Sequence, residues 1–207
     1  MPDRSTLLCL WRNSTGEGSH QTSGKSFKRR NFQEPTKQKR SFKSLCQNFQ
    51  MIQIRCDEGF QDLINEKCIR NILKEFLNCL FDSQTGISVL ITNDAEIQKL
   101  NKQFRKKDYP TDILSWTYDV GGGEIAGLEL NESQEEIIAG ELVVSAEHVR
   151  KQASENGWDF ETELIRLLAH GCAHIAGWDH EESEKQERDM LELEIQLLKV
   201  VGLKNIY

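Results

Sequence analysis

The sequence predicts an α/β or α+β domain in which one sheet is layered with helices. From residue 51 onward, short apolar runs of strand length alternate with longer segments whose apolar residues recur at helical spacing. The composition also changes near Met51, from a basic, hydroxyl-rich segment to an acidic one. Because 207 residues leave room for one domain of ordinary size and an appendage, we expect a single domain over 51–207 and a separate leader over 1–50.

Before residue 117 the expected order of elements is strand, helix, strand, helix, strand. The strands are short apolar runs at residues 51–55, 86–92 and 113–116. The helices are amphipathic segments at residues 60–81 and 95–104. Asn93 or Asp94 can cap the second helix, since a short polar side chain accepts a hydrogen bond from the free N–H groups of a first turn.

After residue 117 a loop precedes one more strand and three helices. Three consecutive glycines, followed by acidic residues as far as Glu136, predict a mobile loop. An apolar run predicts a strand at residues 141–145, and helical periodicity predicts helices at residues 146–156, 160–176 and 183–200. Strands and helices therefore alternate through the domain, as a layered fold with one sheet requires.

The leader differs in charge from the rest of the chain. It holds ten of the 26 Lys and Arg residues and three of the 33 Asp and Glu residues, which leaves residues 51–207 with a formal charge of −14. Few apolar positions recur periodically in the leader, so it buries too little surface to offset the entropy lost on ordering. We therefore expect residues 1–50 to be disordered.

Three roles for the leader stay open. Its basic, acid-poor composition is typical of an organelle transit peptide, a basic tail can hold nucleic acid, or translation starts at Met51 and the leader is an extension of the gene prediction. No segment reaches the ~18 apolar residues of a membrane span, and Leu7–Leu10 is too short for a secretory signal. We expect a cytoplasmic protein without membrane contact, or an organellar one if the leader is a transit peptide.

The cysteines suit a reducing compartment and not a disulfide framework. No Cys-x-x-Cys pair occurs among Cys9, Cys46, Cys56, Cys68, Cys79 and Cys172. Cys172 lies between two histidines, but two positions along a helix it points away from their face. We therefore do not expect Cys172 to bind a metal.

Three of the five histidines lie within eleven residues, in the segment His170-Gly-Cys-Ala-His174-Ile-Ala-Gly177-Trp-Asp-His180. Four-residue spacing places His170 and His174 on one face of a helix. Gly177 permits a left-handed exit from that helix, so the chain can fold back and bring His180 to the same point. Three imidazoles with no evident fourth ligand are typical of a catalytic zinc site with an open position for water.

The spacing matches the H-E-x-x-H-x-x-G-x-x-H motif of the metzincin proteases, with one substitution. Those enzymes use the glutamate after the first histidine as the general base for attack on an amide. Gly171 takes that position in this chain. The ligand spacing is kept while the peptidase base is missing, so peptide hydrolysis is the least favoured activity.

Residues 101–112 place four positive charges in a helix end and loop of an otherwise acidic domain. Cations near a helix C-terminus are mildly stabilising, and this effect alone can account for them. A cationic island can also hold a phosphate, and a guanidinium suits bidentate contact. We expect Arg105, with Lys106 beside it, to bind a phosphate of the substrate.

Three segments, in this order, resemble the YbeY family of bacterial and organellar endoribonucleases and ribosome-maturation factors. They are Leu100-Asn101-x-x-Phe104-Arg105-x-x-Asp108-x-Pro110-Thr111-Asp112-Ile113-Leu114-Ser115-Trp116, Gly140-Glu141-Leu142, and His170-Gly171-x-x-His174-x-x-Gly177-Trp178-Asp179-His180. The resemblance runs from about Met51 to the C-terminus, and the leader has no counterpart in it. Mild departures from the family pattern occur at Phe104, Trp116, Glu141 and Trp178, where Tyr, Phe, Asp and Tyr are usual.

The resemblance implies a single domain with a small mixed sheet, and zinc or another divalent transition metal on His170, His174 and His180. The implied substrate is single-stranded RNA, notably ribosomal RNA of the small subunit during end maturation and quality control. The implied partners are the small ribosomal subunit and its assembly factors, and not DNA. The resemblance also makes Arg105 the functional arginine beside the metal, the residue that charge had already indicated.

With these roles the expected catalytic residues are Arg105 and His170. Zinc lowers the pKa of a bound water to about 7, which would remove the need for a glutamate at Gly171, and Arg105 would neutralise charge on the phosphate. Attack by the 2′-hydroxyl of the RNA, with the metal as Lewis acid, fits the sequence equally. Asp179 is a candidate acceptor for a hydrogen bond from His180, although a solvated loop carboxylate explains it nearly as well.

A non-catalytic ribosome-assembly or RNA-binding factor, with zinc kept for structure, is the alternative function. The acidity of residues 51–207 favours this alternative, because a nuclease that acts alone normally offers more positive surface. An RNA-cleavage assay with and without a chelator separates the two functions.

Overall fold

A four-stranded mixed sheet forms the centre of the fold in the computed structural model, which describes residues 51–81, 85–118, 137–180 and 183–207. The strands lie in the order β1-β2-β4-β3, in which β1, β2 and β4 run parallel and β3 is antiparallel to β4. Their bounds are Ile52–Cys56 for β1, Thr85–Thr92 for β2, Ile113–Thr117 for β3 and Ile137–Ser145 for β4. The predicted fold class, with one small mixed sheet packed by helices, is confirmed.

Helices follow the strands along the chain. The described helices are η2 (Gln61–Leu63, a 3-10 turn), α2 (Glu66–Leu80), α3 (Asp94–Leu100), η3 (Asn101–Arg105, a π-helical turn), α4 (Ala146–Asn156), α5 (Phe160–Ile175) and α6 (Glu184–Val200). α2 provides the crossover that the parallel strands β1 and β2 require. Within the described ranges, no helix is both long and apolar enough to cross a membrane.

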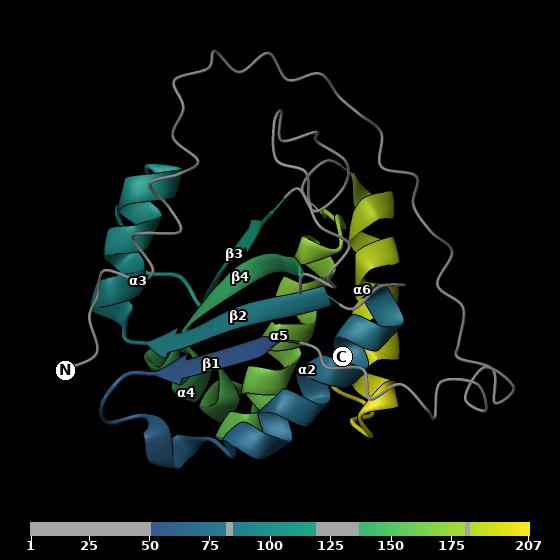
Figure 1. The fold of residues 1–207 in the computed structure, drawn as a ribbon, viewed down its shortest axis with the longest axis horizontal. Coiled ribbons are helices and arrows are strands. Elements are labelled where there is room, and N and C mark those ends of the chain that lie inside the picture. Colours follow the sequence, from purple (N-terminus) through teal and green to yellow (C-terminus); the bar gives the residue numbers. More distant parts are fainter. Residues whose placement is uncertain (1–50, 82–84, 119–136, 181–182) are drawn as a thin grey trace, which may run out of the picture. The chain divides into compact units, whose positions relative to one another are not determined.

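The two faces of the sheet pack against different helices. Val89 and Leu142 belong to the main core, which they share with buried residues of α2, α5 and α6. Leu114 and Val143 point to the other face and pack with Ile97 of α3. Figure 1 shows α3 well apart from α2, α5 and α6, with the strands between them. Among the described helices α5 has the most buried residues, and it packs directly against β3 and β4.

Polar side chains define where the helices begin. Asn93, Ser145 and Asp159 precede α3, α4 and α5, and each accepts a hydrogen bond from the backbone N–H three residues later, at 2.9, 3.2 and 2.8 Å. Each cap satisfies a donor that the first helical turn leaves free. Of the two predicted caps for α3, Asn93 is the one that the structure uses.

Two predicted boundaries were wrong. α2 begins at Glu66 and not at residue 60, because the Asn65 side chain accepts from the Cys68 N–H at 3.1 Å and starts the helix there. β4 begins at Ile137 and not at residue 141, because it pairs with the whole of β2. The predictions for the leader at 1–50 and for the loop at 121–136 concern residues that lie outside the described ones.

Candidate metal centre

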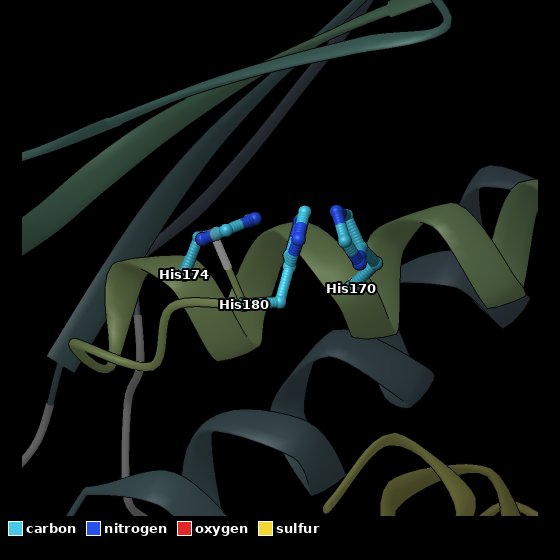
Figure 2. A group of neighbouring side chains, drawn as sticks. All are labelled: His170, His174 and His180. Carbon is cyan, nitrogen blue, oxygen red and sulfur yellow. The ribbon is translucent and has the colours of Figure 1, made fainter. Parts of the chain in front are cut away.

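His170, His174 and His180 converge on one point. A potential ligand atom of each lies within 4.8 Å of those of the other two, and the ring centroids are 4.7, 5.4 and 5.2 Å apart. Figure 2 shows His170 and His174 rising from the same side of α5, with His180 supplied by the segment that follows the helix. The structure therefore brings the three histidines together, while their role as metal ligands stays a prediction.

The end of α5 turns the chain back toward the other two histidines. Gly177 has a φ of +84°, in the left-handed region. Its N–H donates to the His174 carbonyl at 2.9 Å, and the Trp178 N–H donates to the Ala173 carbonyl at 3.0 Å. These two bonds form a Schellman motif, whose left-handed residue is usually glycine because a Cβ is strained there. The predicted left-handed exit at Gly177 is confirmed.

Acceptors outside the cluster hold two of the rings. His170 Nδ1 lies 2.8 Å from Glu194 Oε1, and His174 Nδ1 lies 3.0 Å from the Trp178 carbonyl oxygen. Carbonyl oxygens and ionised carboxylates only accept hydrogen bonds, so the Nδ1 of both rings carries the proton. In this tautomer the lone pair lies on Nε2, which is the nitrogen available to a metal.

Burial and hydrogen bonds shift the pKa values of His174 and Glu194. The pKa of His174 lies below its ordinary value, chiefly because burial disfavours the imidazolium and also because His170 and His180 would repel its charge. Burial opposes the charge of Glu194, but hydrogen bonds from His170 and Tyr207 outweigh this and hold the pKa of Glu194 below its ordinary value. A neutral imidazole and an ionised carboxylate are the forms that cation binding requires.

The cluster opens into a pocket of about 350 Å³. Its other lining residues are Arg105, Thr111, Asp112, Ile113, Ser115 and Asp179. Arg105 is the last residue of η3, and its Nη2 donates to the Ser115 carbonyl of β3 at 3.2 Å. The pocket therefore brings Arg105 beside the histidines, although the two segments are far apart in the sequence.

Lys106 lies beside Arg105 but outside the pocket lining, as far as the described residues define it. It follows η3 with a φ of +60°, and its Nζ donates to the Gln103 carbonyl at 3.0 Å. Lys102 pairs with Asp108 at 2.6 Å. Contact of Lys106 with a substrate stays a prediction.

Gly171 takes the position that the peptidase base holds in metzincins, and the structure gives a packing reason for it. A Cβ on Gly171 would lie 2.6 Å from Leu142 Cδ2 and 2.8 Å from Ile113 Cδ1. α5 therefore lies close against β3 and β4 at this residue, which is buried. A glutamate here would enter the core, so the absence of a peptidase base agrees with the packing of the helix.

Cys172 and Asp179 differ in their relation to the cluster. Cys172 is fully buried, burial raises the pKa of its thiol to about 12, and it stands outside the group of converging ligands among the described residues. Asp179 lines the pocket, and its Oδ1 accepts from the backbone N–H of His180 at 2.7 Å. Asp179 therefore accepts a hydrogen bond from the His180 backbone, and its role as an acceptor behind a metal-bound His180 stays a prediction.

Sequence reasoning missed Glu194, whose carboxylate holds a ring of the histidine cluster. Glu194 is 5% exposed and belongs to the buried side of α6. A signal was available, because a carboxylate among the apolar positions of an amphipathic helix needs a partner. The sequence did not show that this partner is His170, since the pairing joins two helices.

Comparison with known proteins points to one family. Residues 52–202 match the family described as Endoribonuclease YbeY. The Endoribonuclease YbeY of Persephonella marina is 36% identical over 131 residues, covering 63% of this chain and 80% of that protein. The Aquifex aeolicus relative of the same name is 40% identical over 118 residues, covering 57% and 71%. A solution structure from Thermotoga maritima aligns with a TM-score of 0.49 at 27% identity, covering 73% of this chain and 89% of that one.

Proposed function

The chain belongs to the YbeY family of endoribonucleases, and from this premise we propose that it is a zinc-dependent enzyme that cleaves single-stranded RNA. The observation that carries the proposal is the shared pocket, where three converging histidines and the Arg105 guanidinium line one space. Cleavage of a phosphodiester develops negative charge on the phosphoryl oxygens, and a metal together with an arginine stabilises that charge.

The histidine group fits a catalytic zinc ion. Structural zinc sites are closed by four protein ligands, whereas catalytic sites have three and keep one position open. Among the described residues the group has three members, His170, His174 and His180, and it faces the pocket. Bound there, zinc would supply Lewis acidity and lower the pKa of a water molecule. His170 takes its catalytic role in this proposal by holding the metal through Nε2.

Arg105 binds the phosphate in this mechanism. Its side chain is exposed, and one guanidinium nitrogen donates to the Ser115 carbonyl at 3.2 Å. The remaining N–H groups of the planar fork suit two oxygens of one phosphate. The bond to Ser115 fixes the direction of the guanidinium, so Arg105 orients the phosphate as well as attracting it.

Asp112 supplies a fixed negative charge to the pocket. Its Oδ1 accepts from the Thr111 hydroxyl at 3.1 Å and from the Ile113 N–H at 2.8 Å, and its Oδ2 accepts from Gln152 at 3.1 Å. Burial disfavours the charged form, but these hydrogen bonds outweigh it and hold the pKa of Asp112 below its ordinary value. An ionised Asp112 favours a cation in the pocket, and it is a poor proton acceptor near neutral pH.

A non-catalytic RNA-binding assembly factor is the second candidate. The observation in its favour is the charge of −14 on residues 51–207, which offers RNA little positive surface. The pocket favours the enzyme, because a zinc ion kept only for structure needs no open space beside it.

Cleavage of labelled single-stranded RNA by the purified protein tests the proposal. We expect a chelator to abolish cleavage and added zinc to restore it. The His174→Ala protein, prepared identically, controls for contaminating nucleases and should be inactive. If the zinc-loaded protein binds RNA without cutting it, the assembly factor is the better description.

The ribosomal setting is a further part of the proposal and rests on the family resemblance. It places the substrate in the ribosomal RNA of the small subunit, during end maturation and quality control, with the subunit and its assembly factors as partners. Cells that carry only His174→Ala should accumulate small-subunit RNA with unprocessed ends. Normal ends in those cells would contradict the ribosomal role and leave RNA cleavage itself untouched.

A further inference from the structure

Polar contacts lead from His170 away from the pocket to the segment after α6. His170 Nδ1 lies 2.8 Å from Glu194 Oε1, and the Tyr207 hydroxyl donates to Glu194 Oε2. Each oxygen of the carboxylate thus has its own partner, one on α5 and one beyond the end of α6. Glu194 therefore connects a predicted metal ligand with a residue that sequence reasoning did not single out.

Burial makes both hydrogen bonds matter. Glu194 is 5% exposed and lies on the side of α6 that buries Met190, Leu193 and Leu197. A buried carboxylate oxygen without a donor costs free energy, so both oxygens need one. Because Tyr207 satisfies Oε2, Oε1 is free to accept from His170, and the carboxylate cannot rotate without breaking one of the two bonds.

The segment after α6 is fixed well enough to carry Tyr207. Gly202 ends the helix with a φ of +90°. Its N–H donates to the Lys199 carbonyl at 3.1 Å, and the Leu203 N–H donates to the Leu198 carbonyl at 3.0 Å, which repeats the Schellman geometry that ends α5. Leu203 also packs against the main core. The direction of the chain leading to Tyr207 is therefore set by hydrogen bonds and by apolar contact.

Arg166 holds the aromatic ring of Tyr207. The centre of the Arg166 guanidinium lies 6.0 Å from the ring centroid, within the range of a cation–π contact. Arg166 is bound in turn by Glu163, which is fully buried, through Nη2 and Oε1 at 2.6 Å. Glu163, Arg166 and His170 follow one another along α5 at helical spacing, so one helix carries both ends of this series of contacts.

We propose that Glu194 and Tyr207 are a positioning pair that holds His170 as its Nδ1–H tautomer, with Nε2 directed into the pocket. The proposal rests on the proposed function in that the ring so held is a metal ligand. His174 provides the contrast, because its Nδ1 partner is the Trp178 backbone carbonyl. A substitution of side chains can therefore release His170 while His174 keeps its acceptor.

Zinc affinity of the full-length protein, measured by competition with a chromophoric chelator, gives the first test. Glu194→Gln keeps the shape of the side chain but removes its charge, and we expect zinc binding to weaken about 10- to 100-fold. Tyr207→Phe leaves the carboxylate with one donor, and we expect a smaller loss, about threefold to tenfold. Glu192→Gln, at an exposed position of the same helix, is the matched control and should bind zinc like the wild type.

The imidazole N–H protons of the protein as purified, observed by ¹H–¹⁵N NMR, give the second test and need no activity. We expect the Nδ1–H signal of His170 to shift and to exchange faster with water in Glu194→Gln and, to a smaller extent, in Tyr207→Phe. The Nδ1–H signal of His174 should stay in place in every variant and serves as the internal control. If the substitutions only lowered stability, the signals of His170 and His174 should both change. A change in the His170 signal alone therefore indicates a positioning role.

Two results would overturn the positioning pair: zinc affinity in Glu194→Gln within twofold of the wild type, or an unchanged His170 signal in that variant. RNA cleavage is decided separately. Suppose that the wild-type protein cuts no RNA, yet the His170 signal shifts most in Glu194→Gln and less in Tyr207→Phe. That result contradicts the proposed enzyme and supports the positioning pair.

Discussion

The histidine cluster and the cationic segment (residues 102–107) meet at one pocket, but they are built differently. His170 and His174 share the helix α5, both are partly buried, and the Nδ1 of each has an acceptor. Arg105 ends a π-helical turn, is exposed, and donates to the Ser115 carbonyl of a neighbouring strand. The cluster is therefore fixed by local helical geometry and burial, whereas Arg105 depends on how η3 lies against β3.

This difference suits the two regions to two tasks, metal binding by the histidine cluster and phosphate contact by Arg105. A metal requires several ligands at one point, so the loss of any ligand should remove the metal and the activity together. A phosphate contact stabilises charge without building the site, so its loss should slow the reaction and leave the metal in place. Substitutions in the two regions should therefore differ in metal content as well as in rate.

The largest expected effect is that of His174→Ala. Two imidazoles hold a divalent metal much more weakly than three, so we expect near-complete loss of about one equivalent of zinc per chain, and cleavage at background. Elemental analysis and the RNA assay measure the two effects. His148→Ala, on α4 and outside the converging group of the described residues, should retain its zinc. Full zinc content in His174→Ala would contradict the predicted metal centre.

Arg105→Ala should have the next largest effect. We expect the fold and the zinc to be kept and about 2–4 kcal/mol of transition-state stabilisation to be lost, roughly a hundredfold or more in rate. Arg105→Lys should recover only part of the rate, because a point charge lacks the planar fork. Single-turnover cleavage by zinc-matched samples measures the effect. Unchanged cleavage in Arg105→Ala would show that Arg105 does not contact the phosphate and is an ordinary solvated residue at a helix end.

The order of strands and helices was predictable because short apolar runs and helical apolar spacing are local to each element. Val89 and Leu142 lie in such apolar runs, whatever the topology. The start of α2 was missed because Asn65 and several residues before it are equally plausible starts until the Cys68 N–H is seen to bond to Asn65. The antiparallel direction of β3 could not be predicted from periodicity either, because the spacing of apolar residues does not indicate the direction in which strands pair.

The same distinction holds at the candidate site. His170, His174 and Gly177 were predictable because their geometry is local to one helix and its end. Glu194 and Tyr207 were missed because their contacts join separate elements, and no spacing in the sequence encodes such a contact. Sequence therefore indicated the three histidines that converge, and the groups that hold the His170 ring became visible only in the packed structure.

Lowering the pH should affect the histidine cluster but not the cationic segment. We expect this effect to be gradual and smaller than those of the two substitutions above. The pKa of His174 lies below the ordinary value of about 6.5, so His174 stays neutral down to lower pH than a free histidine does. Its contribution to folding and to zinc binding is therefore complete above about pH 6.5 and is lost as the pH falls through its lowered pKa. We expect dialysis at pH 7 to leave the zinc in place, and stepwise acidification below pH 6 to release it. Zinc retained in full as the pH falls well below 6 would contradict histidine ligands.

Arginine side chains keep their positive charge throughout this pH range. RNA binding that depends on the cationic segment should consequently persist at a pH where zinc has left. Fluorescence anisotropy of labelled RNA, measured on the same acid series, compares the two regions directly. Simultaneous loss of zinc and of RNA binding would mean that the metal, and not the cationic segment, carries the affinity.

The smallest expected effect is that of Lys106→Ala. Lys106 is exposed, lies outside the pocket lining of the described residues, and its Nζ donates to the Gln103 carbonyl. An exposed lysine near a phosphate contributes a screened attraction, so we expect RNA binding about twofold to threefold weaker, a shallower salt dependence and an unchanged rate at saturation. Lys99→Ala, which removes an exposed lysine paired with Glu96 on α3, is the matched control and should change none of these. A hundredfold loss of rate in Lys106→Ala with zinc intact would assign the phosphate contact to Lys106. Arg105 would then have only the structural role of its hydrogen bond to the Ser115 carbonyl.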